Sequence, residues 1–168
     1  AKTRKTAATS PKPQMQALCV KNDMSILKEI EEAWGWVGIK PQEVVIENEF
    51  GNLIVKDFDD KFWRICPEDV YCEVVAESIE EYNTLIKNEE FLEDWFMSAM
   101  VTEAEQNLGV LEPGYKYHMV IPGVLGGEYG GKNVKVAPLI ELIKFSGDLG
   151  KQIEELPEGA QIQLKVVP

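Results

Sequence analysis

The fold is decided between residues 44 and 76, which read VVIENEFGNLIVKDFDDKFWRICPEDVYCEVVA. Short runs rich in β-branched and aromatic residues predict strands at 44–46, 52–55, 62–66 and 71–76. The connections between these runs are rich in Gly, Asn, Asp and Pro, which favour tight turns. This segment therefore predicts an antiparallel meander.

The residues on either side of the meander carry helical patterns. Before it, apolar residues three and four apart predict a helix from Ser25 to about Gly35. After it, residues 78–81 form a capping box, and Asn88 is placed to cap a second helix that runs to Gly109. The helix at 25–35 and the helix that ends at Gly109 both have apolar positions that would face a core.

The C-terminal part alternates between strand and helix patterns. We expect a strand at 115–121, a glycine-rich loop at 123–131, short helices at 138–145 and 149–156, and a final strand at 161–167. The fold class predicted is α+β, with a mostly antiparallel sheet made of the N-terminal meander plus C-terminal strands. The helices are expected to pack on one face of this sheet.

The charge is distributed unevenly along the 168 residues. Residues 1–23 carry a net charge of +4, and the remainder carries −16, for a total of −12. We expect 1–23 to be a flexible basic tail or leader, with a nucleic-acid-binding arm as the less favoured alternative. We expect 24–168 to be a single domain. Its acidity disfavours nucleic acid and anionic membranes as partners and favours a basic protein.

Cysteine and histidine content bounds the chemistry. Cys19, Cys66 and Cys72 are an odd number of thiols, and the sequence contains a single histidine, His118. Cys66 and Cys72 could pair in an oxidising compartment, but the sequence shows no signal peptide, so a reduced, cytoplasmic location is favoured. Zinc would need about four nitrogen or sulfur ligands, and the spacing of the three cysteines and the one histidine suggests no such site. We therefore expect no metal site, and we also expect no cofactor. No apolar run is long enough to span a bilayer.

Three motifs are considered for catalysis or ligand binding. Residues 126–133, GGEYGGKN, approach the phosphate-cradling pattern, but Asn133 replaces its hydroxyl residue and the segment after it opposes a helix. His118 lies in a strand-like run, where a structural histidine is favoured over a catalytic one. Asp57, Asp59 and Asp60 are better explained by a hairpin turn than by a calcium loop. The sequence thus predicts a protein that is not an enzyme.

The acidic surface remains as the candidate binding feature. Carboxylates on the meander and its turns could form an electrostatic landing site for a basic protein, and Trp36 or Tyr129 is an aromatic that could anchor it. The predicted partner-binding residues are Glu47, Glu49, Asp57, Asp59, Asp60, Glu68, Asp69, Glu128 and Tyr129. Glutamates and aspartates at 80, 81, 89, 90, 93 and 94 decorate the predicted helices. A surface that serves only solubility is the simpler alternative.

Five blocks of this sequence, in order, resemble one bacterial domain. They are ENEFGN at 47–52, FWRICPED at 62–69, EFLEDW at 90–95, VIPGVLGGEY at 120–129 and LPEG at 156–159. The chain resembles the C-terminal domain of type VI secretion immunity proteins that protect against DNase toxins, over about residues 26–167. The resemblance implies a cytoplasmic, non-enzymatic protein that binds a cognate toxin, a nuclease, and blocks its basic substrate-binding surface. It carries over no catalytic residues.

Two other functions remain open from the sequence. The first is a small enzyme or ligand-binding domain with a cleft beside the loop at 123–131, which a polar pocket around His118 and Glu128 would favour. The second is an acidic adaptor for another basic protein. The sequence indicates no oligomeric state.

Overall fold

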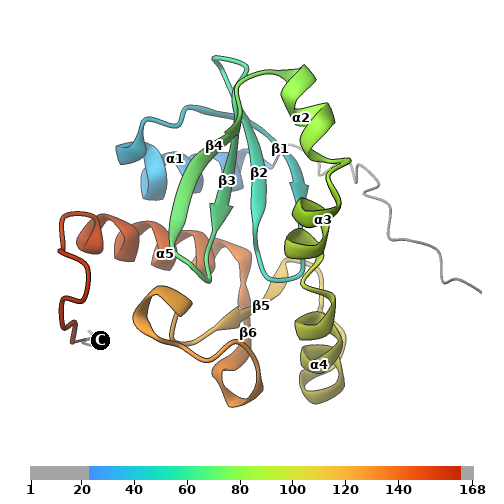
Figure 1. Ribbon diagram of the computed structural model, residues 1–168, viewed down its shortest axis with the longest axis vertical. Coiled ribbons are helices and arrows are strands. Elements are labelled where there is room, and N and C mark those ends of the chain that lie inside the picture. The colour runs from blue at the N-terminus through green and yellow to red at the C-terminus, as the bar shows by residue number, and fades with distance from the viewer. Residues whose placement is uncertain (1–22, 164–168) are drawn as a thin grey trace, which may run out of the picture.

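The computed structural model describes residues 23–163, which form two antiparallel sheets and the helices around them (Figure 1). In chain order the helices and strands are α1 (Met24–Trp34), β1 (Pro41–Glu47), β2 (Leu53–Asp57), β3 (Phe62–Cys66), β4 (Tyr71–Ala76), α2 (Ile79–Leu85), α3 (Glu89–Phe96), α4 (Ser98–Leu108), β5 (Tyr115–Met119), β6 (Val134–Pro138) and α5 (Leu139–Ile153). Single 3₁₀ turns lie at Gly35–Val37, Gly123–Leu125 and Gly131–Asn133.

The larger sheet is the predicted meander. Its strands lie side by side in the order β1-β2-β3-β4, and each neighbouring pair is antiparallel. Leu53 lies opposite Ile65, and Ile65 lies opposite Cys72, so these three side chains share one face. The predicted α+β class and antiparallel meander are confirmed.

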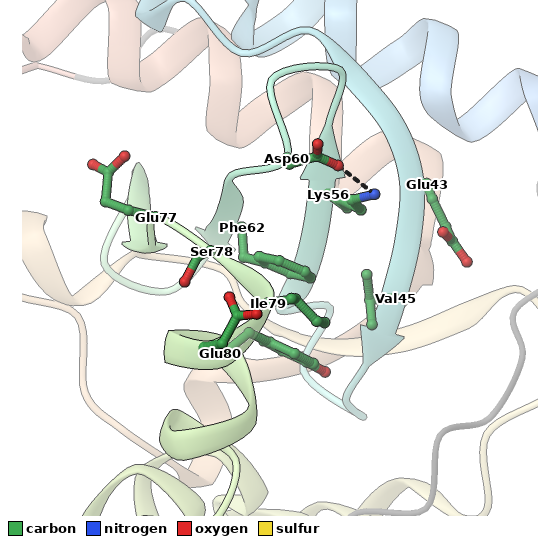
Figure 2. Close-up of a pocket in the computed structure, with 10 residues that line it drawn as sticks. Glu43, Val45, Lys56, Asp60, Phe62, Glu77, Ser78, Ile79 and Glu80 are labelled. Atoms are coloured by element: carbon green, nitrogen blue, oxygen red, sulfur yellow. Dashed lines mark ion pairs between the residues drawn. The ribbon is translucent and has the colours of Figure 1, made fainter.

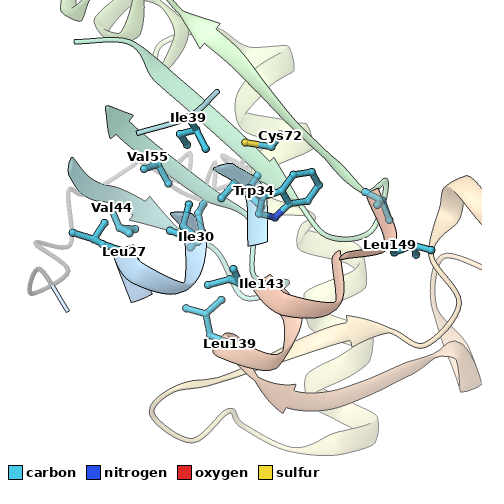
Figure 3. Close-up of a cluster of buried hydrophobic side chains, with 13 residues drawn as sticks. Leu27, Ile30, Trp34, Ile39, Val44, Val55, Cys72, Leu139, Ile143 and Leu149 are labelled. Carbon is cyan, nitrogen blue, oxygen red and sulfur yellow. The ribbon is translucent and has the colours of Figure 1, made fainter. Parts of the chain in front are cut away.

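One face of this sheet packs against α1 and α5, which run across it together (Figures 1 and 3). The packing is close because Gly147 and Gly150 of α5 lie directly against α1. A Cβ atom at Gly147 would be 2.5 Å from the carbonyl oxygen of Ala33, and one at Gly150 would be 2.9 Å from the Trp34 ring. The cluster comprises Leu27, Ile30, Trp34, Ile39, Val44, Leu53, Val55, Ile65, Val70, Cys72, Leu139, Ile143 and Leu149.

The opposite face packs against α2 and α3, so helices cover both faces of the meander and not the one face that we expected. Tyr82 of α2 stacks on Phe62, with ring centroids 4.4 Å apart, and Trp95 of α3 is buried in the same cluster beside Ile46 and Ile54. This second core follows from alternation along β2, where Ile54 faces away from its neighbours Leu53 and Val55.

Two helix boundaries differ from the sequence prediction. The segment after Asn88 forms two helices, because Met97 adopts a left-handed conformation with φ of 45° and separates α3 from α4. The two short helices predicted at 138–145 and 149–156 are one continuous helix, α5. Its Gly147 looked like a break, but it is the point where α5 meets the α1 backbone.

The second sheet pairs β5 with β6 and lies beside the β1–β2 turn. The Tyr117 amide donates a hydrogen bond to the Glu49 carbonyl at 2.9 Å, and the Phe50 and Tyr117 rings are 5.7 Å apart. These contacts hold β5 against the β1–β2 turn, and β5 leads directly into the segment that contains the glycine-rich loop.

The predicted termini fall largely outside the described range. Of the predicted tail at 1–23, only Asp23 is described, and its carboxylate caps α1 by accepting from the Ser25 amide at 2.9 Å. Residues 161–163 form no strand, and the rest of the final strand predicted at 161–167 lies beyond the described residues. Within residues 23–163, no helix is long and apolar enough to cross a membrane.

Candidate partner-binding surfaces

The predicted binding residues lie at opposite ends of the meander. In an antiparallel meander the β2–β3 turn is at one end, and the β1–β2 and β3–β4 turns are together at the other. We define the hairpin end as residues 57–61, the start of α2 at 77–80, and Glu43. We define the loop end as the turns at 48–52 and 67–70 together with the glycine-rich loop. Two separate surfaces therefore replace the single surface expected.

Asp57 shapes the hairpin end from inside. It is only 2% exposed, and its carboxylate accepts from the amides of Asp59 and Lys61, each at 2.9 Å, and from the Trp63 indole at 2.7 Å. The prediction that Asp57 contacts a partner is therefore wrong, because its oxygens are used within the turn. The hairpin-turn interpretation of the Asp-rich segment is confirmed.

The tip of this hairpin exposes an aromatic ring between acids. Phe58 is 66% exposed, although its amide is fixed by a 3.1 Å hydrogen bond to the Lys40 carbonyl. Asp59 and Asp60 beside it are exposed, as predicted. Asp60 takes a left-handed conformation, with φ of 63°, that Asp and Asn tolerate better than most residues. Phe58 is not among the residues predicted from the sequence, although an aromatic within an acidic turn is the available signal.

A pocket of about 630 Å³ lies between this hairpin, β1 and the start of α2 (Figure 2). Apolar groups of Val45, Phe62, Ile79 and Tyr82 line it, together with Lys56, Ser78 and four acidic residues, Glu43, Asp60, Glu77 and Glu80. Lys56 forms an ion pair with Asp60 at 2.6 Å, and Glu77 forms one with Lys61 at 3.1 Å. Among residues 23–163, Glu43 and Glu80 form no ion pair. The pocket thus combines an apolar lining with surplus negative charge.

At the loop end, the glycine-rich loop is tied to the β3–β4 turn. The Gly123 amide donates to the Glu68 carbonyl at 2.6 Å, and the Tyr129 hydroxyl donates to the Asp69 carboxylate. Burial and this hydrogen bond raise the pKa of Tyr129. Both Asp69 and Tyr129 are exposed at their outer surfaces, as predicted, but their polar atoms already bind each other.

The remaining predicted residues at this end have different environments. Glu68 is 5% exposed, so it has no surface for direct partner contact, and the prediction for it is wrong. Glu47 is partly buried and pairs with Lys116 at 3.2 Å. Glu49 and Glu128 are exposed and stay as predicted candidates.

A buried polar chain that the sequence analysis missed connects the second core with the loop end. The Arg64 guanidinium donates to Asn52 Oδ1 at 2.9 and 3.0 Å and pairs with Asp94 on α3. Asn52 in turn donates to Glu68 Oε1 at 2.6 Å, whereas Glu68 Oε2 is buried without a partner in the described part of the chain. Burial raises the pKa of Glu68. The available signal was an arginine inside an apolar strand, which needs buried acceptors.

The glycine-rich loop has a structural explanation. Its following segment, 134–138, is strand β6, so the helix needed to cradle phosphate is missing at that place, as the sequence predicted. Asn133 closes the loop, because its side-chain amide donates to the carbonyls of Ile121 and Glu128 and its oxygen accepts from the Ile121 amide. The adjoining pocket of about 310 Å³ is lined by Ile121, Val124, Leu125, Ala160 and Ile162, which carry no catalytic side chain.

The thiols and the histidine are poorly placed for nucleophilic catalysis. Cys72 lies opposite Ile65 and Cys66 lies opposite Tyr71, so the two thiols belong to different faces of the sheet and both are free. Burial raises the pKa of Cys66 and raises that of Cys72 to about 12, which keeps both protonated at neutral pH. Burial lowers the pKa of His118. Among residues 23–163 no cluster of His, Cys, Asp or Glu could hold a metal ion.

One protein family matches part of this chain. Residues 76–150 match a protein family model. That family is described as the C-terminal part of T6SS immunity protein Tdi1. The match confirms the resemblance to type VI secretion immunity proteins from α2 through most of α5, whereas a DNase target stays a prediction. It leaves out the sequence blocks at 47–52, 62–69 and 156–159.

One solved structure supports the fold. The crystal structure of Atu4351 from Agrobacterium tumefaciens superposes with a TM-score of 0.53 at 19% sequence identity, over 76% of this chain. The chain spans 64% of the length of that protein, and the likeness shows the fold alone. No curated protein matches the sequence.

Proposed function

We propose that this protein is an immunity protein that binds and neutralises a cognate secreted toxin. The observation that carries the proposal is the family match over residues 76–150, which covers nearly half of the chain. The toxin class we propose is a nuclease, whose basic substrate-binding surface this protein would cover. The proposed mode is inhibition by binding, without catalysis.

The distribution of charge supports a basic partner. From Ile79 to Leu108, helices α2, α3 and α4 follow one another along one side of the molecule (Figure 1), and this segment has eight acidic residues against Lys87 alone. A nuclease must carry positive charge where it holds phosphates, so a surface of this sign can compete with nucleic acid. Opposite charge also accelerates the encounter of two proteins.

The chemistry of the described residues supports a binding role in the cytoplasm. Cys66 and Cys72 are free thiols held apart in the sheet, which suits a reducing compartment. Burial raises the pKa values of the two thiols and lowers the pKa of His118. These shifts reflect packing in the fold and give no sign of a nucleophile activated by a neighbouring base. We therefore propose a cytoplasmic inhibitor with a protein partner and no nucleic acid or membrane partner.

The decisive experiment is co-expression with the effector encoded beside this gene. We expect growth to be restored when this chain is present, and the purified proteins to form a complex whose association slows as salt is raised. The control is a toxin from an unrelated effector class, against which this chain gives no protection. Continued killing by the adjacent effector, with both proteins expressed and soluble, would refute the proposal.

A further inference from the structure

We propose that the hairpin end is the docking surface for the basic partner, with Phe58 inserting into the partner and the adjacent pocket receiving one of its lysine or arginine side chains. This inference rests on the proposed function and goes beyond it, because it selects one of the two surfaces and assigns a role to a residue outside the family match. It concerns a protein partner that presents a basic segment.

Phe58 is suited to insertion because its turn is already ordered. Its amide donates to the Lys40 carbonyl, and the amides of Asp59 and Lys61, which follow it, donate to the Asp57 carboxylate. Because the backbone of the turn is already ordered, binding has to fix only the side-chain torsions of Phe58, which lowers the entropy lost on binding. An aromatic side chain that is 66% exposed in the free protein also gains by being covered.

The pocket beside this hairpin, which Lys56 and Asp60 help to line, fits the two parts of a long basic side chain. Its volume of about 630 Å³ falls in the range of sites that enclose small ligands. The apolar surfaces of Val45, Phe62 and Ile79 can contact an aliphatic stem. Glu43 on β1 and Glu80 on α2 lie on different sides of the pocket (Figure 2), and either carboxylate can attract the charged group. Ile79 is half exposed, so this apolar surface is open to a partner.

The protein's own lysine shows that the pocket favours a cation. Lys56 reaches Asp60 inside this site (Figure 2), and the hydrogen bond to Asp60 raises the pKa of Lys56, with the nearby charges of Glu43 and Asp57 acting in the same direction. Lys56 pairs with Asp60 and leaves Glu43 and Glu80 without an ion pair in the described chain. These two carboxylates give the pocket negative charge that can attract a basic side chain of a partner.

The loop end lacks this combination of features. Its acids are largely engaged, since Asp69 binds Tyr129, Glu47 binds Lys116 and Glu68 is buried. The pocket beside the glycine-rich loop is smaller, about 310 Å³, and is lined by apolar residues. Charge complementarity to a basic partner thus favours the hairpin end.

The experiment compares matched variants at the two ends, using the effector encoded beside this gene as the binding probe. At the hairpin end the variants are Phe58→Ala and the double variant E43Q/E80Q. At the loop end the controls are Val124→Ala and Glu128→Gln, which also truncate an exposed apolar residue and neutralise an exposed acid. All substituted side chains are exposed, so folding should be retained, and circular dichroism checks this.

We expect Phe58→Ala to weaken binding by about tenfold or more, mainly through faster dissociation, as for a buried aromatic anchor. We expect E43Q/E80Q to weaken binding and to reduce its dependence on salt, while both controls stay within about twofold of wild type. Hydrogen exchange in the complex should show protection at residues 56–62 and 77–82.

The outcomes separate the two proposals. If the wild-type protein does not bind this effector, the proposed function fails. If the wild type binds but the hairpin-end variants bind equally well, or protection appears only at the glycine-rich loop, the proposed function stands and the assignment of the hairpin end is overturned.

Discussion

The two ends of the meander are organised by different kinds of contact. At the hairpin end, the Asp57 carboxylate binds the amides of Asp59 and Lys61, two and four residues away. At the loop end, Tyr129 binds Asp69 across 60 positions of sequence. The first arrangement is set by neighbouring residues, whereas the second exists only after distant segments have packed together.

This difference affects how the two surfaces respond to change. A turn held by local hydrogen bonds keeps its shape as long as its own strands pair. The loop end depends on the β3–β4 turn, the buried polar chain through Arg64 and the β5–β6 sheet, so damage in any of these reaches it. We therefore expect the loop end to open at a lower free energy than the hairpin end.

The largest effect is expected from Arg64→Ala, which tests whether the buried polar chain supports the loop end. The substitution leaves Asn52 and Glu68 buried without the guanidinium, and it removes the ion pair with Asp94. We expect the free energy of unfolding to fall by about 3 kcal/mol, measured by urea denaturation.

The matched control for Arg64→Ala is Asp94→Asn. The Asp94 side chain is 64% exposed, so its loss should cost only about 0–1 kcal/mol. Equal effects of the two substitutions would show that the surface ion pair, and not the buried chain, carries the stabilisation.

The second effect comes from Gly127→Ala, which should separate the loop end from the rest of the fold. A Cβ atom at this position would lie 1.7 Å from the Ile121 carbonyl oxygen, so the loop must move. We expect a loss of about 2 kcal/mol in unfolding free energy. Hydrogen exchange should rise at 120–133, with no change at 57–61.

Gly126→Ala provides the comparison within the same loop. No atom lies within 4 Å of a Cβ there, but φ is +82°, so only backbone strain of about 1 kcal/mol is expected. Exchange that rises equally at both ends in the Gly127 variant would refute the independence of the two surfaces.

The third effect is the converse change at the hairpin end. One Asp57 oxygen accepts from the two amides, and the other accepts from the Trp63 indole. Asp57→Asn replaces one of these oxygens with an NH₂ group, which cannot accept, so one of the two sets of hydrogen bonds is lost. We expect a loss of about 1–2 kcal/mol, with faster exchange confined to residues 57–63. Asp59→Asn, in an exposed side chain, should leave stability unchanged within about 0.5 kcal/mol. If the Asp57 variant also loosens 120–133, the two ends are coupled.

The same contrast explains what the sequence could predict. The meander, the Asp-rich turn, and the caps at Ser78 and Asn88 were predicted because their signals lie within a few residues of each other. The break at Met97 and the continuity of α5 through Gly147 were missed because both depend on packing against distant segments.

The candidate binding residues show the same limit. Asp59 and Asp60 were correctly expected at the surface, but Glu68 was not recognised as buried, because its partner Asn52 is 16 residues away. Acidic residues are usually exposed, and sequence alone does not show when one is enclosed by a tertiary network. Sequence also placed all nine candidates in one group, since only the strand topology assigns them to opposite ends.

The smallest effect concerns the charge of Glu68 at the loop end. Burial is the main cause of its raised pKa, opposed by the Asn52 hydrogen bond and by Arg64, whereas Asp69 acts in the same direction as burial. Because the folded protein holds this proton more tightly than the unfolded chain, the contribution of Glu68 to stability falls as pH rises from the ordinary pKa of a glutamate, 4.5, toward the raised pKa.

Glu68→Gln removes this titration and retains an oxygen that can accept from Asn52. We expect the variant to be slightly more stable than wild type at pH 7, with the difference shrinking toward pH 4, in thermal unfolding measured across that range. A wild type that gains stability relative to the Glu68 variant between pH 5 and pH 7 would mean that Glu68 is stabilised as a carboxylate, and that Arg64 outweighs burial at the loop end.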